Sequence, residues 1–258
     1  MSAGTNVDSE SLSFAGRDLR PRGSSSLTPA AEGYERWAPI YDDDPNPLLA
    51  REERYLLPLL ASLQNKRTLD LACGTGRWVE KLKAHGGSRV GIDCSVAMLR
   101  VAAKKEAASG RVARGICESL PFRTAVFDLA ICSFALGHIR DLASVGRELA
   151  RVTRPGASIF VSDLHPEAFA QGWRVGFRDG TTAVQIETLP RTAEEIVQAF
   201  NSSGFECITQ VPLRLGEPEK PIFVKAGKIH SFAAACQLPA VLACHFKRLD
   251  SPGPQGAS

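Results

Sequence analysis

The sequence has no long apolar run, no closely paired cysteines and no cluster of basic residues. No apolar stretch is long enough to cross a bilayer, and no basic head followed by an apolar core marks a secretory signal. The net charge is only +3, and no run of five basic residues occurs, so a nucleic-acid footprint is not indicated. We therefore expect a cytoplasmic protein without a membrane or nucleic-acid partner.

The seven cysteines lack the C-x-x-C spacing of metal and redox pairs. Their odd number and their positions in apolar stretches predict small buried side chains in a reducing compartment. Without paired ligands a zinc site is not expected, and we interpret the acidic stretch 42–44 as a solvated turn.

The remaining sequence fits one α/β domain. Its 258 residues are 44% hydrophobic, which is enough for a large core. Residues 1–30 and 247–258 are expected to be disordered tails, and residues 31–246 form the domain. Within it, residues 31–66 are predicted to be a helical cap, broken where Pro45 and Pro47 stop a helix.

After the cap, short apolar segments alternate with helical patterns. The apolar segments predict five strands, at 68–72, 88–93, 111–117, 127–135 and 157–164. Between them, helices are expected at 76–85, from Ser95 to about Gly110, and from the capping residue Asp141 to the "RPG" stretch. Strands that are apolar on both faces and alternate with helices belong to a parallel sheet.

The C-terminal third departs from this alternation. Residues 166–191 are predicted to be an insertion with a hairpin around "RDGTT", followed by a capping box from Thr192 to Glu195. "FECITQVPL" and "PIFVKAG" then predict two strands, one of them antiparallel. The expected fold is a doubly wound, mostly parallel seven-stranded sheet, Rossmann-like, with a helical N-terminal cap and an insertion after the fifth strand.

The stretch "LDLACGTGRW" (69–78) predicts a strand, a glycine turn and a helix, an arrangement that binds nucleotides. A dinucleotide turn needs a third glycine where this chain has Val79, and a P-loop needs a Gly-Lys-Ser/Thr that is absent. Asp70 would repel a pyrophosphate, which disfavours a nicotinamide cofactor. Asp93 ends the next strand, where a carboxylate can accept both hydroxyls of a ribose. A nucleoside with a cationic, zwitterionic tail, such as S-adenosylmethionine, suits both acids.

Five segments together resemble the successive motifs of class I S-adenosylmethionine-dependent methyltransferases. They are "LDLACGTGRW", "GIDCS", "CESLPF", "FDLAICSFALGHIRD" and "RVTRPGASIFVSD". The branch is similar to the small-molecule, quinone-biosynthesis type, and the resemblance covers roughly residues 35–228. It implies an enzyme that uses S-adenosyl-L-methionine to methylate a small-molecule substrate on O, N or C.

The resemblance also implies a set of cofactor-binding residues: Tyr41, Asp70, Ala72, Gly74, Gly76, Asp93, Cys94, Met98, Cys117, Glu118, Ser133 and Phe134. Trp37 is expected near Tyr41. The chain departs from the family's pattern twice, because Ala72 replaces a glycine and Ile116 replaces an aspartate that would meet the adenine amino group. Either the cofactor binds more weakly as a result, or Glu118 or a backbone group compensates.

Two histidines are candidate catalytic residues. His138 is either a base near the acceptor or a structural residue, and His165 follows the fifth strand at the same rim of the sheet. Trp173, Phe177 and Arg178 of the insertion either line the acceptor pocket or form its own small core. Methyl transfer needs alignment more than it needs a base, so a catalytically silent protein of this fold that binds a partner is the alternative.

Overall fold

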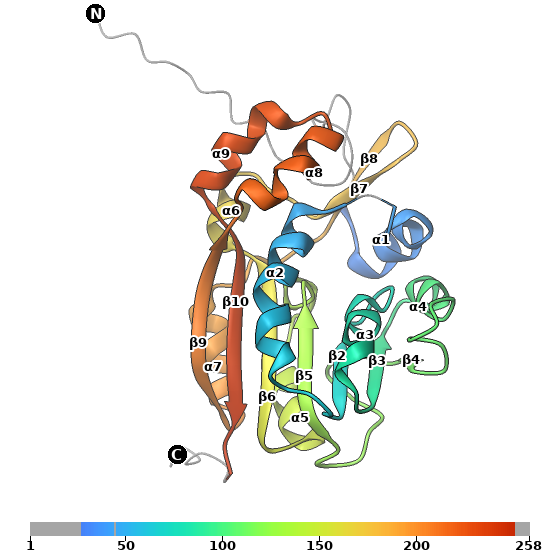
Figure 1. Ribbon diagram of the computed structural model, residues 1–258, viewed down its shortest axis with the longest axis vertical. Helices are drawn as coiled ribbons and strands as arrows, with labels where there is room; N and C mark the ends of the chain where they lie inside the picture. Colours follow the sequence, from blue (N-terminus) through green and yellow to red (C-terminus); the bar gives the residue numbers. More distant parts are fainter. Residues whose placement is uncertain (1–26, 44, 251–258) are drawn as a thin grey trace, which may run out of the picture.

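Seven strands form one sheet at the centre of the computed structural model, which describes residues 27–43 and 45–250 (Figure 1). Their order in space is β4-β3-β2-β5-β6-β10-β9. The bounds are β2 (Thr68–Leu71), β3 (Arg89–Asp93), β4 (Val112–Arg114), β5 (Phe127–Ser133), β6 (Thr153–Leu164), β9 (Phe205–Arg214) and β10 (Pro239–Arg248). Neighbours from β4 to β6 are parallel, and β10 is antiparallel to both β6 and β9. The predicted Rossmann-like fold class is confirmed.

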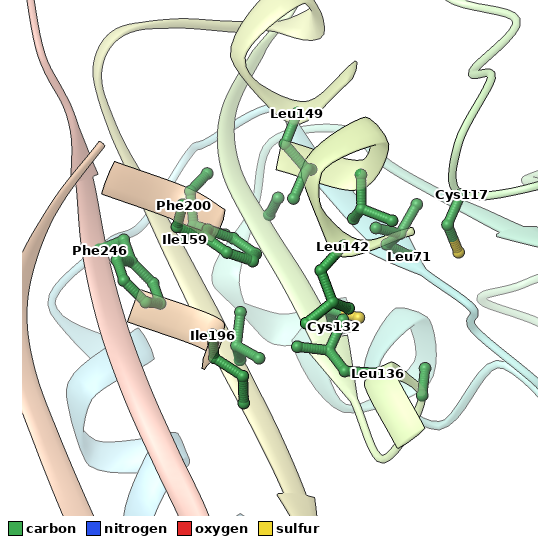
Figure 2. Packing of buried hydrophobic residues seen from close by; sticks show 14 of the residues in the cluster. Leu71, Cys117, Cys132, Leu136, Leu142, Leu149, Ile159, Ile196, Phe200 and Phe246 are labelled. Atoms are coloured by element: carbon green, nitrogen blue, oxygen red, sulfur yellow. The ribbon is translucent and has the colours of Figure 1, made fainter. Parts of the chain in front are cut away.

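Helices cover both faces of the sheet because the central strands are apolar on both sides. On one face, Leu129 and Ile131 of β5 pack with buried residues of α2 (Pro47–Ala61) and of α3 (Arg77–Lys81) with its 3-10 continuation η2 (Leu82–His85). On the other face, Ala130 and Cys132 pack under α5 (Leu142–Val152) and α7 (Ala193–Asn201). Figure 2 shows this second layer, in which Phe200 of α7 stacks on Phe246 of β10 with ring centroids 4.6 Å apart.

The cap and the insertion lie together at one end of the sheet (Figure 1). The insertion holds α6 (Pro166–Ala170) and the antiparallel hairpin β7 (Gly176–Asp179) to β8 (Thr182–Ile186), as predicted. The cap holds β1 (Leu27–Thr28), α1 (Ala30–Trp37) and the 3-10 turn η1 (Ala38–Ile40), and β1 pairs in parallel with β8. Trp37 stacks on Phe177 at 5.2 Å, and Arg36 pairs with Asp179 at 2.9 Å. The insertion therefore supports the cap directly.

The structure confirms the first predicted C-terminal strand, because "FECITQVPL" lies in β9, and corrects the second. Residues 221–225 of "PIFVKAG" lie in a helix, α8 (Lys220–Lys225), which follows the 3-10 turn η4 (Glu217–Glu219). Pro221 fits a first helical turn because it needs no hydrogen-bond donor there, and this outweighs the strand propensity of the segment. The antiparallel strand is β10, which follows η5 (Ile229–Ser231) and α9 (Phe232–Gln237). Most of its residues are buried because its two faces pack into different core clusters, Leu242 and Cys244 into one and Val241 and Ala243 into the other.

Other boundaries also differ from the predictions, and the strand predicted at 157–164 already begins at Thr153. The helix that begins after Ser95, α4, spans only Val96–Ala102, and turns follow it to Gly110 because they bury Ala107 and Ala108. The third strand is shorter than 111–117, because the chain leaves the sheet after Arg114. Residues 27–28 pair with the insertion and residues 247–248 extend β10, so neither segment belongs to a disordered tail; the rest of the expected tails, apart from Pro29–Ala30 and 249–250, lies outside the described residues. Within the described part of the chain, no helix is long and apolar enough to span a membrane.

Candidate functional site

The glycine turn between β2 and α3 adopts left-handed backbone conformations. Gly74 has φ +53° and Gly76 has φ +77°, which glycine reaches without steric cost. A β-carbon on Gly76 would lie 3.2 Å from the β-carbon of Ala102, so this glycine lets α3 pack closely on α4. A β-carbon on Gly74 would meet no other atom within 4 Å, so this position faces open space. Ala72, the residue that replaces the family's first glycine, has φ +54°.

A cavity of about 290 Å³ opens beside this turn, at the carboxyl ends of the strands. Ten of the twelve predicted cofactor residues line it, namely Tyr41, Ala72, Gly74, Asp93, Cys94, Met98, Cys117, Glu118, Ser133 and Phe134. The other two, Asp70 and Gly76, do not line it. His138, Ile116 and Tyr34 also line it, and of these Tyr34 was not predicted.

Asp93 is fixed in the wall of this cavity. Its Oδ2 accepts a hydrogen bond from Gly74 N at 2.7 Å, and its Oδ1 accepts one from Ser95 N at 2.8 Å. Burial raises the pKa of Asp93, and the backbone N–H groups of Ser95 and Gly74 act against that rise. Each carboxylate oxygen keeps a lone pair for a further donor, such as a ribose hydroxyl.

Asp70 lines a second, adjoining cavity of about 40 Å³, with Thr75 and Arg77. Its side chain is only 4% exposed, and Oδ2 has no hydrogen-bond partner among the described residues. Burial raises the pKa of Asp70 to about 7, against the opposing charge of Arg77. A buried, unpartnered carboxylate oxygen is costly, so this site favours a cationic ligand group.

A third cavity, of about 50 Å³, extends towards the insertion and has mostly apolar and aromatic walls. Trp37, Leu164 and Trp173 line it. Tyr41 and Phe134 line all three cavities, so they stand where the three meet. The ring of Trp37 lies 4.8 Å from that of Tyr41, which confirms that the two are neighbours.

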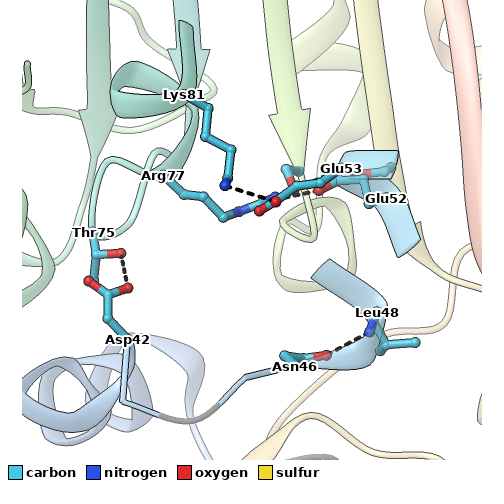
Figure 3. Close-up of polar contacts among 10 residues, drawn as sticks. Asp42, Asn46, Leu48, Glu52, Glu53, Thr75, Arg77 and Lys81 are labelled. Atoms are coloured by element: carbon cyan, nitrogen blue, oxygen red, sulfur yellow. Dashed lines mark hydrogen bonds and ion pairs between the residues drawn. The ribbon is translucent and has the colours of Figure 1, made fainter. Parts of the chain in front are cut away.

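Helix α2 is tied to the site by a buried acidic cluster that the sequence did not reveal (Figure 3). Glu52 is fully buried and accepts hydrogen bonds from Arg77, from Ser162 and, at 2.7 Å, from Ser133. Arg77 also pairs with Glu53 at 3.1 Å. Burial acts to lower the pKa of Arg77, but the two carboxylates hold it above its usual range. This cluster fixes Ser133 in the wall of the large cavity.

In the acidic stretch that the sequence predicts to be a solvated turn, Asp42 serves as a contact of the cap, and residue 44 lies outside the described residues. Asp42 accepts a hydrogen bond from Thr75 Oγ1 at 2.8 Å (Figure 3). It also pairs with Lys105 at 2.7 Å. Glu35 of α1 accepts from Ser95 Oγ at 2.8 Å at the start of α4. No group of metal-ligating side chains occurs among the described residues. The cap is therefore held over the cavity by polar contacts at several points.

His138, in the 3-10 turn η3 (Leu136–His138), joins the cap to the insertion. Its Nε2 lies 3.0 Å from Tyr34 Oη, and its Nδ1 lies 3.0 Å from the carbonyl oxygen of Glu187. Burial lowers the pKa of His138, and the nearby Asp163 carboxylate acts to raise it. Burial in turn raises the pKa of Asp163, which accepts from Gly137 N at 2.7 Å.

His165 lines none of the three cavities. It is the N-cap of α6, and its Nδ1 accepts a hydrogen bond from Glu167 N at 3.2 Å. This geometry gives it a capping role, and its catalytic role stays a prediction that the geometry does not favour.

The insertion serves both purposes that the sequence left open. Trp173 lines the third cavity, whereas Phe177 packs with Val184 and Ile186 in the core of the hairpin. Arg178 donates to the carbonyl of Thr181 at 2.9 Å. All seven cysteines are free thiols, and Cys73, Cys117, Cys132 and Cys244 are buried.

Comparison with known proteins gives a family match over the glycine turn and the strands that follow. The family described as "Methyltransferase domain" matches residues 69–161. The 2-phytyl-1,4-naphtoquinone methyltransferase of Synechococcus elongatus is 36% identical over 155 residues, which cover 55% of this chain and 66% of that protein. The ubiquinone biosynthesis O-methyltransferase of Pseudomonas aeruginosa is 32% identical over 140 residues, with coverages of 51% and 56%. The chain spans about two thirds or less of these curated relatives.

Solved structures share the architecture. The S-adenosylmethionine-dependent methyltransferase of Mesorhizobium loti superposes with a TM-score of 0.61 at 21% identity, covering 77% of this chain and 98% of that one. SpnF, described as a [4+2]-cyclase, superposes with a TM-score of 0.62 at 16% identity, covering 88% and 100%. At these identities the likeness shows the fold alone. The family match, the related sequences and the fold agree, and the chain belongs to the class I S-adenosylmethionine-dependent methyltransferases, enzymes that use S-adenosylmethionine as their cofactor.

Proposed function

We propose that this protein transfers a methyl group from S-adenosylmethionine to a small organic acceptor, on O, N or C. The observation that carries the proposal is the pair of carboxylates on either side of the glycine turn. Asp70 presents a buried oxygen that meets no donor in the described part of the chain, and Asp93 presents a carboxylate that two backbone N–H groups hold in place. A cationic amino-acid end and a ribose are the two ligand parts that such carboxylates bind.

The residues of the site fit this cofactor. Asp70 would pair with its ammonium group and Asp93 with its ribose hydroxyls, while Cys94 and Met98 would flank the adenine in the large cavity and Cys117 would lie at its edge. Ile116 lines the same cavity with 53% of its surface exposed, and Glu118 lies two residues on, so Glu118 is our candidate for the adenine amino group. When bound, the cofactor supplies a methyl group on a cationic sulfur.

The acceptor is expected where the third cavity joins the large one, at Tyr34, Tyr41 and Phe134, because the third cavity of about 50 Å³ is itself smaller than the roughly 150 Å³ that accommodates a benzene ring. The walls there are mostly apolar, so they would exclude water and position the acceptor, which is the main requirement of methyl transfer. An apolar small molecule suits these walls. Two relatives carry quinone-related names, which supports a ring-bearing acceptor for this chain as well.

Two measurements test the proposal. Isothermal titration calorimetry should detect binding of S-adenosylhomocysteine, the demethylated product, and absence of binding at millimolar ligand would contradict it. Transfer of a radiolabelled methyl group to members of a panel of small aromatic alcohols, amines and activated ring carbons should then be detectable. Binding without transfer to any probe would instead favour the alternative, a catalytically silent protein of this fold that binds a partner.

A further inference from the structure

Tyr34 occupies a position that the cofactor alone does not explain. It belongs to the cap helix α1, yet its side chain lines both the large cavity and the apolar third cavity. Tyr41 and Phe134 are the other two residues that line both. Of these three, only Tyr34 forms a hydrogen bond to an ionisable side chain within the described residues, through its 3.0 Å contact with His138 Nε2.

The direction of this hydrogen bond follows from the groups around the imidazole. The carbonyl oxygen of Glu187 can only accept, so the neutral His138 ring carries its proton on Nδ1 and donates it there. Its Nε2 is then an acceptor, and the Tyr34 hydroxyl is the donor. The phenolic oxygen keeps lone pairs that can accept a proton from a further group. The arrangement can therefore pass a proton from the cavity to Nε2.

Two groups offset part of the cost of placing a positive charge on the buried His138 ring. Its Nδ1–H keeps the Glu187 carbonyl, and the buried Asp163 carboxylate is close enough to favour the charged ring. Asp163 is itself held by the backbone N–H groups of Gly137 and Leu164, both at 2.7 Å. Tyr34 from α1, Glu187 from the segment after β8 and Asp163 from β6 are the polar groups identified around the imidazole.

We propose that Tyr34 and His138 remove the proton of a hydroxyl group on the methyl acceptor, with Tyr34 in contact with the acceptor and His138 as the final base. The acceptor O–H bond breaks and an O–CH₃ bond forms, with the methyl group drawn from the sulfonium, whose S–CH₃ electron pair stays on sulfur. The hydroxyl proton passes to Tyr34 Oη as the phenolic proton passes to His138 Nε2. One cation, the sulfonium, is consumed and another, the imidazolium, is formed. This inference rests on the proposed function and narrows its acceptor to hydroxyl compounds.

A purely structural role for the pair predicts different behaviour. The cap is also held by the contacts of Glu35, Arg36 and Asp42, so it does not depend on Tyr34 alone. Tyr34→Phe keeps the ring and its stacking on Trp37, where the centroids lie 5.8 Å apart, and removes only the hydroxyl. Loss of proton transfer should therefore appear without loss of folding or of cofactor binding.

The first experiment needs no acceptor. Nitrogen-15 NMR of the imidazole rings, with His138→Gln used for assignment, should show His138 protonated on Nδ1 and unprotonated on Nε2 in the wild-type protein at pH 8. In Tyr34→Phe the Nε2 resonance should shift, because its hydrogen-bond donor is gone. Protonation on Nε2, or a resonance that Tyr34→Phe leaves unchanged, would overturn the relay.

The second experiment measures transfer from radiolabelled S-adenosylmethionine to catechol, 1-naphthol and 1,4-dihydroxynaphthalene. Wild type should form O-methyl products, and Tyr34→Phe should lower kcat by about 100-fold with unchanged affinity for S-adenosylhomocysteine. The decline of the wild-type rate at acidic pH, as His138 becomes protonated, should be lost in Tyr34→Phe. Tyr55→Phe, a partly buried tyrosine of α2 that lines none of the three cavities, is the matched control.

The outcomes separate this inference from the proposed function. An active Tyr34→Phe, or methylation at carbon only, would overturn the relay. Binding of S-adenosylhomocysteine without transfer to any of the three hydroxyl probes would overturn the hydroxyl acceptor and leave the cofactor assignment intact. Failure to bind S-adenosylhomocysteine would instead overturn the proposed function itself.

Discussion

The buried carboxyl of Asp70 should make the stability of the cofactor-free protein depend on pH. Burial raises its pKa from 3.8 to about 7 in the folded protein, and its Oδ2 has no partner among the described residues. The unfolded chain ionises this group above about pH 4, whereas the folded protein keeps it protonated up to about pH 7. The free energy of unfolding should therefore fall as pH rises through this window, by up to about 4 kcal/mol from this group alone.

Asp70→Asn removes the titrating group, so the free energy of unfolding of the variant should not fall in this way as pH rises. The variant should be more stable than the wild type, and its advantage should grow by roughly 2–3 kcal/mol between pH 5 and pH 8. Urea unfolding followed by circular dichroism at pH 5, 6.5 and 8 measures the difference. Asp250→Asn, on an exposed bend, is the control and should show no such trend. An advantage of Asp70→Asn that is independent of pH would refute the reasoning.

Asp70 should also make cofactor affinity depend on pH, and affinity should rise with pH where stability falls. An ammonium group beside Asp70 favours the ionised carboxylate, so S-adenosylhomocysteine should bind more tightly as pH rises through 7 and should release a proton near pH 6. Calorimetry in two buffers of different ionisation enthalpy detects that proton. Asp70→Asn should bind at least about tenfold more weakly at pH 8. Equal affinity there would contradict the ammonium assignment.

Three further predictions concern the frame of the site. Asp93→Ala removes both ribose contacts and the acceptors for Gly74 N and Ser95 N, so the affinity for S-adenosylhomocysteine should fall by about 2–3 kcal/mol in calorimetry; unchanged affinity would refute the ribose assignment. Ala72→Gly relieves a left-handed alanine at φ +54° and should stabilise the protein by about 0.5 kcal/mol in urea unfolding, whereas a loss of 1 kcal/mol would count against strain there. Glu52→Gln leaves Arg77 with Glu53 as its remaining carboxylate and should lower the free energy of unfolding by about 2–3 kcal/mol. The control Glu53→Gln, at the less buried partner, should cost less. Equal costs would show that burial does not govern this cluster.

Local sequence patterns predicted most of the fold. The alternation of apolar strands with amphipathic helices predicted the parallel half of the sheet, and the capping box from Thr192 to Glu195 is present as expected. The pattern failed at "PIFVKAG", where strand-like composition lies in a helix whose only fully buried side chain is Phe223. Tertiary packing decides such short segments, because propensity differs too little between the two states.

Some residues of the candidate site could likewise be predicted from the sequence, and others could not. Backbone-determined positions, such as Gly74 and Asp93, follow from the motif because the turn itself places them. Tyr34, Glu52 and Arg77 act through contacts between elements far apart in the chain. Their roles therefore cannot be predicted from residue spacing in the sequence. A glutamate on the apolar side of α2 was the available signal for Glu52, since a buried acid needs a partner.

A crystal structure of the full chain with S-adenosylhomocysteine tests the central claim most directly, through the distances from its amino nitrogen and ribose hydroxyls to the two carboxylates. Our account predicts the amino nitrogen within about 3 Å of Asp70 Oδ2 and both ribose hydroxyls on Asp93. A ligand bound elsewhere, or an Asp70 oxygen that still lacks a partner in the complex, would contradict it.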